Sequence, residues 1–247
     1  MANWNDPRPT GTGFGASPSL SGIQGRSEVF DAGLRRHMLS IYNYMASGVL
    51  LSGIVALVFA TSGLAAAVFG TPLRWVVALA PLAFVMVMSF GINRLSTTAM
   101  KSLFWAFSVV MGMSLSAIFF VYTGPSIAVT FFATAGAFAG LSLFGYTTKK
   151  DLSGFGSFLI MGMFGLLIAS VINIFLKSPG LAWAVSFLGV LIFAGLTAYD
   201  TQRLKEEYAY VAGTDFAGKA IVMGALSLYL DFINMFTFLL QFMGDRR

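Results

Sequence analysis

The chain contains no cysteine, only one histidine and few charged side chains. Without cysteine, disulfides, thiolate metal sites and cysteine nucleophiles are excluded. The single histidine, His37, follows Arg35 and Arg36 and lies outside the apolar runs, so a zinc site built from histidine ligands is not expected. Charged residues make up 10% of the 247 residues, whereas a typical soluble domain carries about 25%. This shortage of charge argues against an ordinary water-exposed surface.

Hydrophobic sequence is abundant instead. Hydrophobic residues make up 57% of the chain, and the mean hydropathy is +0.81. Each apolar stretch is close to the ~20 residues that cross a ~30 Å hydrocarbon core as a helix. We therefore predict an all-α integral membrane protein with seven transmembrane helices, at about residues 43–63, 75–93, 103–122, 126–146, 156–176, 182–201 and 220–243.

The N-terminal region has a different composition. Residues 1–26 are rich in Gly, Ser, Pro and Asn and contain few large apolar side chains. Such a segment buries too little surface to offset its ordering entropy, and it lacks the pattern of a signal peptide. We predict that residues 1–38 form a mobile cytoplasmic tail and that residues 39–247 form the transmembrane domain.

The basic residues predict the orientation. With the N-terminus inside, eleven lie in cytoplasmic segments and four in outer segments, as the positive-inside rule requires. The net charge of +5 then reports topology, and no nucleic-acid partner is expected. An odd number of spans places Arg246 and Arg247 outside, unless the last run is a broken or re-entrant helix that returns the C-terminus to the cytoplasm. Two glycine pairs, Gly136 with Gly140 and Gly162 with Gly165, predict close backbone packing between helices.

Asp231 is the most unusual residue, because it lies in the middle of the last apolar run. A carboxylate at bilayer depth costs several kcal/mol, so it usually faces a partner or a water-filled path. The alternative is a structural acid that joins helices through a hydrogen bond. Ser227, Asp231, Asn234 and Gln241 share one helix face, which predicts that this helix lies inside the bundle.

Asp200 and Arg94 are the other two charged residues of interest. Asp200 closes the sixth span, and its position alone favours an interfacial charge followed by snorkelling Arg203 and Lys205. Two carboxylates that met within a few ångströms could not both ionise easily, so an Asp200–Asp231 pair would be a proton-sensitive switch. If each helix ends where its apolar run ends, Asp200 and Asp231 differ in depth by about one and a half helical turns. This difference in depth opposes the pairing. Arg94 ends the second span, either as a plain anchor or as a guanidinium that latches helices through the acids.

Several segments resemble the Bax-inhibitor-one family, the membrane proteins that carry a Bax-inhibitor motif. They are Tyr199-Asp200-Thr201-Gln202, Lys149-Lys150-Asp151-Leu152, Asn173-Ile174-Phe175 and the stretch from Ala225 to Asn234. The resemblance covers about residues 39–244 and implies a bacterial inner-membrane protein in which six helices surround a central seventh. It also implies a pH-sensitive calcium leak channel, with Asp200 and Asp231 as the sensor pair and Arg94 as their partner in the closed state. One departure is that residues 79–88 hold no acid, whereas some members have one in the second span.

The leading hypothesis is therefore a passive calcium or cation leak channel gated by the Asp200–Asp231 dyad and latched by Arg94. Asp200 and Asp231 are candidate calcium ligands, and Ser227 and Asn234 are candidates to line the ion path, since calcium prefers oxygen ligands. No cofactor is expected beyond calcium as the transported ion.

Two other classes of function compete with this hypothesis. The first is a non-transporting modulator that binds a membrane-bound AAA protease, with the N-terminal tail as a recognition arm. The second is an intramembrane aspartyl protease, which we do not expect because neither aspartate follows the Gly-x-Gly pattern that such enzymes need. The chain is accordingly predicted not to be an enzyme.

Overall fold

The computed structural model describes residues 20–247, with side chains from residue 29 onward. Within this range the chain forms helices and no strand, and Tyr122 and Arg246 make one isolated antiparallel bridge. The helices are α1 (Leu20–Thr61), α2 (Leu64–Phe69), α3 (Leu73–Gly91), α4 (Thr97–Leu115), α5 (Ile118–Val121), α6 (Gly124–Thr147), α7 (Ser153–Leu176), α8 (Pro179–Val211) and α9 (Ala217–Met243).

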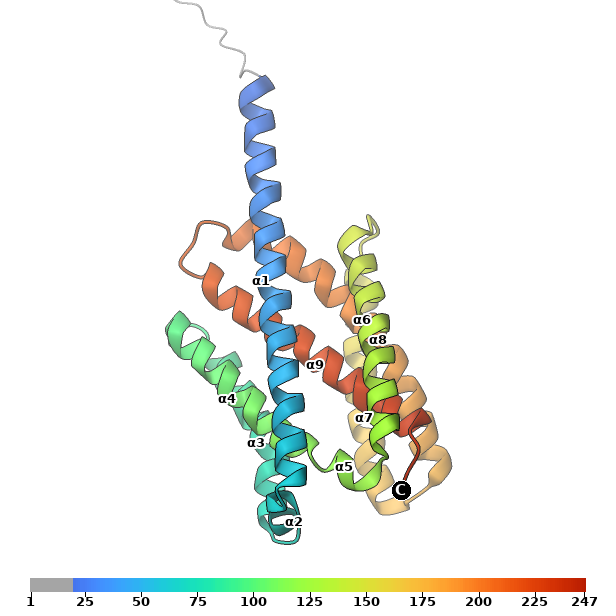
Figure 1. The fold of residues 1–247 in the computed structure, drawn as a ribbon. Helices are drawn as coiled ribbons and strands as arrows, with labels where there is room; N and C mark the ends of the chain where they lie inside the picture. The colour runs from blue at the N-terminus through green and yellow to red at the C-terminus, as the bar shows by residue number, and fades with distance from the viewer. Residues whose placement is uncertain (1–19) are drawn as a thin grey trace, which may run out of the picture.

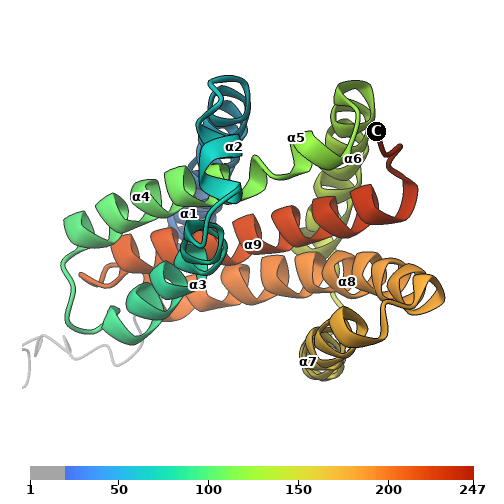
Figure 2. The ribbon, with the colours of Figure 1, turned by 90° about the horizontal axis from the view of Figure 1, so that it is seen from below.

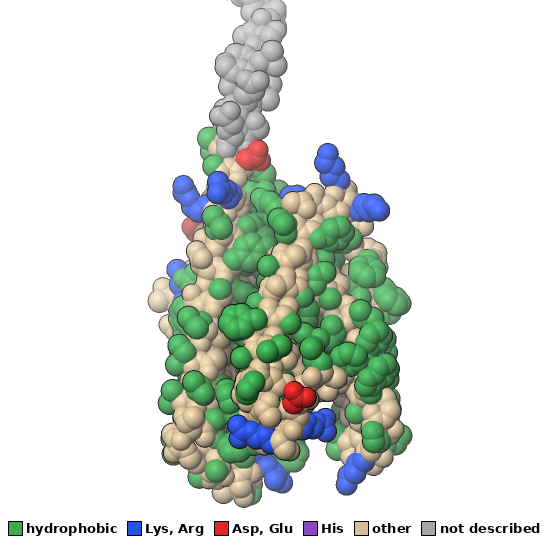
Figure 3. Space-filling model, turned by 45° about the vertical axis from the view of Figure 1, so that its right-hand side comes forward, with side chains coloured by type: hydrophobic (Ala, Val, Ile, Leu, Met, Phe, Trp, Pro, Cys, Tyr) green, Lys and Arg blue, Asp and Glu red, His purple; other side chains and the backbone are tan. Residues whose placement is uncertain are grey.

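Seven of these helical segments are long and apolar enough to cross a bilayer. They are α1 from Val29, α3, α4 continued through α5, α6, α7, α8 and α9, so every predicted span is confirmed. On the face shown in Figure 3, lysine and arginine side chains gather toward the two ends, and the surface between them is mainly hydrophobic. The protein is a membrane-embedded, multi-pass helical protein; that its N-terminus is cytoplasmic stays a prediction.

The first helix begins far earlier than the first predicted span. The expected boundary at residue 38 falls inside α1, which starts at Leu20 and runs for 42 residues (Figure 1). Leu34, Met38, Ile41 and Met45 are buried and lie three or four residues apart, so this part of the helix has its own apolar face. Residues 1–19, the remainder of the predicted mobile tail, lie outside the described part of the chain.

The final helix forms the core of the bundle. Of the spans, α9 has the largest buried share, 61% of its apolar window, and it packs against α8, α1, α6 and α4. Figure 2 shows α9 running between α4 and α8. The inner position predicted from its polar stripe is therefore observed. The ring of six surrounding helices is not confirmed, because α3 packs chiefly against α4 and α7 against α8.

The tightest backbone packing occurs at glycines other than the predicted pairs, and of the second pair Gly162 packs against the Ile192 side chain of α8 while Gly165 faces open space. A Cβ atom at Gly145 of α6 would collide with the backbone of Ala198 in α8, and one at Gly112 of α4 would collide with the backbone of Ser52 in α1. At Gly136 and Gly140, by contrast, a Cβ would meet open space. The prediction for that glycine pair is wrong, because its face points away from the neighbouring helices.

The last helix is unbroken, so the re-entrant alternative is also wrong. After Met243 the chain binds the corner between α5 and α6: the Thr123 amide donates to the Asp245 carbonyl at 3.1 Å, and the Arg247 amide donates to the Val121 carbonyl at 3.0 Å. This corner lies at the end of the bundle opposite the α8–α9 loop (Figure 1). The C-terminus therefore lies on the far side of the membrane from the start of α9.

Candidate functional site

The two acids of the predicted pair lie at similar depths, because both helices extend beyond their apolar runs. Helix α8 continues from Asp200 to Val211, eleven residues further, and α9 begins at Ala217, fourteen residues before Asp231. The difference of three residues is less than one helical turn. The expected mismatch in depth is therefore absent, and the packing of α8 against α9 brings the two acids into one region.

Asp200 lies in a small polar cluster between these helices. Its carboxyl group is buried, and the Ser227 hydroxyl of α9 donates a hydrogen bond to Oδ2. Arg203 Nη2 lies 3.3 Å from Asp200 Oδ1 and donates to Ser227 Oγ at 3.2 Å. Both carboxyl oxygens of Asp200 thus have a partner, as a buried carboxylate requires.

Asp231 differs from Asp200 in that one of its carboxyl oxygens lacks a partner in the described part of the chain. It is buried, and its Oδ2 atom has no hydrogen-bond partner among the described residues. The charges of Asp200 and Arg203 both act on it. Most buried polar groups are paired, so an unpaired one points to strain, a functional role, or a bound water or ion. The site therefore holds one satisfied acid and one with free bonding capacity.

The other two candidate residues of α9 have different surroundings. Ser227 belongs to the Asp200 cluster. Asn234 lies about one turn beyond Asp231, and its Nδ2 donates to the Leu230 carbonyl of its own helix at 2.8 Å. Its amide oxygen can still accept a donor or a cation. The structure thus joins Ser227 to the acids and leaves Asn234 on the next turn.

Arg94 does not reach the acids in this structure. It is exposed and forms no ion pair with any residue of the described range, where Arg203–Asp200 is the ion pair observed. Arg203 lies three residues after Asp200 on the same helix, a spacing that brings two side chains together without any help from another span. The expected latch is thus absent at Arg94, and Arg203 supplies the guanidinium.

The end of α3 is held by a different residue. Lys219, near the start of α9, donates from Nζ to the Ile92 carbonyl at 3.0 Å. Ile92 immediately follows the last residue of α3, whose carbonyls lack partners within the helix. In the sequence Lys219 is one of the eleven basic residues assigned to cytoplasmic segments, and a basic residue near a helix C-terminus commonly has the role seen here.

A cavity of about 220 Å³ leads toward the polar cluster between α3, α8 and α9. Arg203 and Ser227 lie in its wall, so one side of the Asp200 cluster faces this space. The remaining lining residues are Val85 and Ser89 of α3, Leu204 and Glu207 of α8, and Met223, Gly224, Leu226 and Leu230 of α9. The cavity lies toward the end of the bundle where α8 ends and α9 begins, the predicted cytoplasmic side.

Sequence reasoning missed the role of Gln202, next to these residues. Its Oε1 accepts from the Leu152 amide and its Nε2 donates to the Lys150 carbonyl, both at 2.8 Å. The loop between α6 and α7 is therefore fastened to α8. Thr201 in turn shares a 2.9 Å hydrogen bond with Ser142 of α6. The Tyr199–Arg203 stretch is thus a junction between three helices and a loop, and the sequence assigned a site role only to its aspartate.

The metal-binding capacity of the site is limited. Within residues 29–247 no group of three or more His, Cys, Asp or Glu side chains could hold a metal ion. Asp200 and Asp231 provide two carboxylates, whereas calcium takes six to eight oxygen ligands. Two carboxylates alone are therefore too few ligands to enclose a calcium ion.

Comparison with known proteins agrees with this architecture. Residues 34–247 match the family described as inhibitor of apoptosis-promoting Bax1. The inner membrane protein YbhL of Escherichia coli K12 is 46% identical over 220 residues, which cover 87% of this chain and 94% of the relative. An uncharacterized protein of Caulobacter vibrioides is 52% identical over 231 residues, which cover 88% of this chain and 91% of the relative. An uncharacterized protein of Rickettsia prowazekii is 43% identical over 224 residues, which cover 90% of this chain and 94% of the relative. A match over most of the chain, together with the seven spans, shows that this protein belongs to the Bax-inhibitor-one family.

Proposed function

We propose that the protein is a passive, proton-sensitive leak channel for calcium or a similar cation. Its proposed location is the bacterial inner membrane, because its relative YbhL is named as an inner membrane protein. The observation that carries the proposal is the unpaired, buried Oδ2 of Asp231 near the Asp200–Ser227–Arg203 cluster. A free carboxyl oxygen inside an apolar bundle is costly unless it exchanges a proton or meets a cation. The same pair of acids can do both.

The proton-sensitive step follows from the different surroundings of the two acids. Arg203 and Ser227 compensate the charge of Asp200, while Asp231 has no such donor at Oδ2. Two neighbouring carboxylates in a shielded site do not both ionise easily. A proton taken up from the cavity therefore goes to the pair as a unit, and its arrival removes one negative charge from the cluster.

Opening of the channel is assigned to α3, the outer helix that lines the cavity. Arg203 lies in the wall of the cavity between α3, α8 and α9, and its hold on the cluster weakens when the pair is protonated. Helix α3 packs chiefly against α4, so moving it away from α8 and α9 costs mainly the burial of Met88 and the hydrogen bond from Lys219 to the Ile92 carbonyl. Loss of negative charge also weakens cation binding, so flux passes through a maximum at an intermediate pH.

The cation is held by oxygen atoms during its passage. Asp200 and Asp231 supply carboxylates, and Ser227 and Asn234 supply neutral oxygens. Calcium prefers such ligands, and water completes its shell. The residues line a transfer path and perform no covalent chemistry, so we propose no enzymatic activity.

Calcium flux into liposomes at several pH values tests this function. We expect wild-type protein to admit calcium at a rate that depends on pH. In Asp231→Asn we expect the pH-dependent part of this flux to fall at least tenfold. Asp245→Asn is the control, since it removes an exposed acid at the opposite end of the bundle. Unchanged pH dependence in Asp231→Asn would overturn the proposal. If the full chain conducts no ion but binds a membrane protease, and deletion of residues 2–19 abolishes that binding, the protein is a modulator instead.

A further inference from the structure

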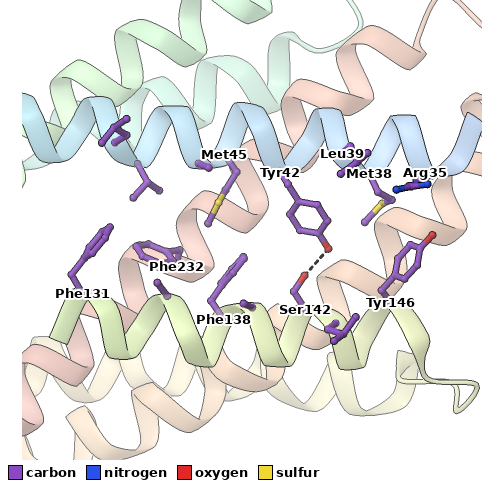
Figure 4. Close-up of a pocket in the computed structure, with 16 residues that line it drawn as sticks. Arg35, Met38, Leu39, Tyr42, Met45, Phe131, Phe138, Ser142, Tyr146 and Phe232 are labelled. Carbon is purple, nitrogen blue, oxygen red and sulfur yellow. Dashed lines mark hydrogen bonds between the residues drawn. The ribbon is translucent and has the colours of Figure 1, made fainter. Parts of the chain in front are cut away.

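A large hollow of the described structure lies between α1 and α6. It has a volume of about 780 Å³, within the ~300–1,000 Å³ range of ligand pockets. Figure 4 shows Met38, Tyr42 and Met45 of α1 facing Phe138 and Ser142 of α6 across it. Phe232 of α9 also lines this space, which we call the α1–α6 groove.

The groove is apolar along its length and open to the membrane. Apart from Arg35, Tyr42, Ser142 and Tyr146, its lining residues are aliphatic, methionine or phenylalanine. Leu39, Leu50 and Leu143 are exposed at its sides. A second hollow of about 410 Å³ shares Val49, Phe131 and Phe232 with it and continues it toward α5. A concave apolar surface of this kind accommodates an apolar ligand.

The dimensions match one leaflet of a bilayer. Arg35 and Leu50 mark the two ends of the groove on α1, and fifteen residues of helix rise about 22 Å. Half of a bilayer, with its headgroup layer, is about 20–22 Å thick. The groove therefore extends from the headgroup level at Arg35 to the middle of the membrane near Leu50.

Positive charge marks the headgroup end. Arg35 is exposed and forms no ion pair with any residue from 29 to 247. Lys205 lies behind Tyr146, with its Nζ 5.3 Å from the centre of that ring and 2.9 Å from the Tyr146 carbonyl oxygen. No acidic residue lines the groove. An unpaired guanidinium is a strong, bidentate ligand for phosphate, and basic pockets between transmembrane helices bind anionic headgroups.

The width of the gap argues against a protein helix as the occupant. Tyr42 of α1 and Ser142 of α6 share a hydrogen bond of 2.6 Å across the groove (Figure 4), so one tyrosine side chain spans the distance between the two helices. A helix with its side chains is about 10–12 Å across and does not enter such a gap. An acyl chain, which is only a few ångströms wide, can lie along it.

We propose that the α1–α6 groove binds one anionic phospholipid from the leaflet at the N-terminal end of α1. The phosphate pairs with the Arg35 guanidinium, and an acyl chain lies along the groove toward Val49 and Phe131. The binding is specific for a net negative headgroup, because a zwitterionic lipid carries a cation that Arg35 repels.

Native mass spectrometry of the full chain in detergent, with added phosphatidylglycerol or phosphatidylcholine, tests this site. We expect the wild type to retain one phosphatidylglycerol per chain and Arg35→Ala to reduce that retention at least fivefold, with partial rescue by Arg35→Lys. Arg36→Ala is the matched control, because it removes the same charge from an exposed neighbour that does not line the groove. Equal retention in Arg35→Ala and Arg36→Ala, or equal binding of the two lipids, would overturn the proposal.

Filling the groove gives a second test that does not depend on charge. Ala139 lines the groove, whereas Ala137 is exposed on α6 outside it. We expect Ala139→Phe to release the lipid and Ala137→Phe to keep it, with the same size-exclusion elution for both variants. Retention by Ala139→Phe contradicts the proposed position. A dimer that disappears in Ala139→Phe would instead assign the groove to a contact between two copies of the chain.

Discussion

Helices α9 and α3 are both long, apolar and part of the same bundle, yet their surroundings are nearly opposite. In α9, 61% of the apolar window is buried, and in α3 only 11%. The polar cluster is built from α8 and the inner α9, while α3 contributes Val85 and Ser89 to the wall of the adjoining cavity. The difference teaches that the polar site is built from the inner helices, and in the proposed mechanism α3 is the helix that moves.

The largest expected effect compares one phenylalanine from each environment. Phe104 of α4 is fully buried against α1 and α9, whereas Phe90 of α3 is 81% exposed. We expect Phe104→Ala to lower the free energy of unfolding by about 3–5 kcal/mol through the cavity it leaves, and Phe90→Ala to change it by less than about 1 kcal/mol. Thermal unfolding in detergent measures both. Equal losses would mean that α3 is as tightly packed as the core.

A glycine pair on α6 gives the next effect. A Cβ at Gly145 would collide with the Ala198 backbone, while one at Gly140 would meet open space. We expect Gly145→Ala to destabilise the protein by about 1–3 kcal/mol and Gly140→Ala to be neutral or slightly stabilising, because alanine favours a helix. The midpoint of thermal unfolding decides between them. A stable Gly145→Ala variant would show that α6 and α8 are further apart than described.

The arginines Arg203 and Arg94 test the same contrast, between the inner helices and α3, through the pH dependence of calcium flux. Removing the guanidinium beside Asp200 leaves the acid pair with less positive charge nearby, so the pair binds its proton at higher pH. We expect Arg203→Gln to move the pH of maximal calcium flux upward by roughly one unit. Arg94→Gln is expected to leave it unchanged, since Arg94 contacts neither acid. A shift caused by Arg94→Gln alone would restore the latch predicted from the sequence.

The smallest effect concerns a hydrogen bond in the core. The Tyr229 hydroxyl lies 2.6 Å from Ser52 Oγ, which also lies 2.7 Å from the Ser108 carbonyl oxygen. We expect Tyr229→Phe to lower the free energy of unfolding by about 1 kcal/mol, since Ser52 keeps another partner. Tyr210→Phe, at a side chain that is 84% exposed, serves as the control. A loss of several kcal/mol would show that this bond organises α1, α4 and α9 as a unit.

The sequence predicts the spans well because hydrophobic length alone determines them, and it predicts the inner position of α9 because Asp231 and its polar neighbours would be costly in lipid. It does not predict which charged side chain meets Asp200. The apolar run predicts that the sixth span ends near residue 201 and makes Arg203 an interfacial anchor, whereas α8 continues to Val211. The packing glycines were misassigned for a related reason: spacing shows which residues share a face but not which face meets a neighbour, and Gly145 has no partner at the expected four-residue spacing.

Infrared difference spectroscopy of the reconstituted protein during a pH titration tests the central claim most directly, because a protonated carboxylic acid has its own carbonyl band. We expect one such band to appear as the pH falls, to disappear in Asp231→Asn and to shift in Asp200→Asn. If no carboxylic-acid band depends on Asp231, or if the Asp200→Asn variant leaves it unmoved, the two acids do not share a proton and this account of the site is wrong.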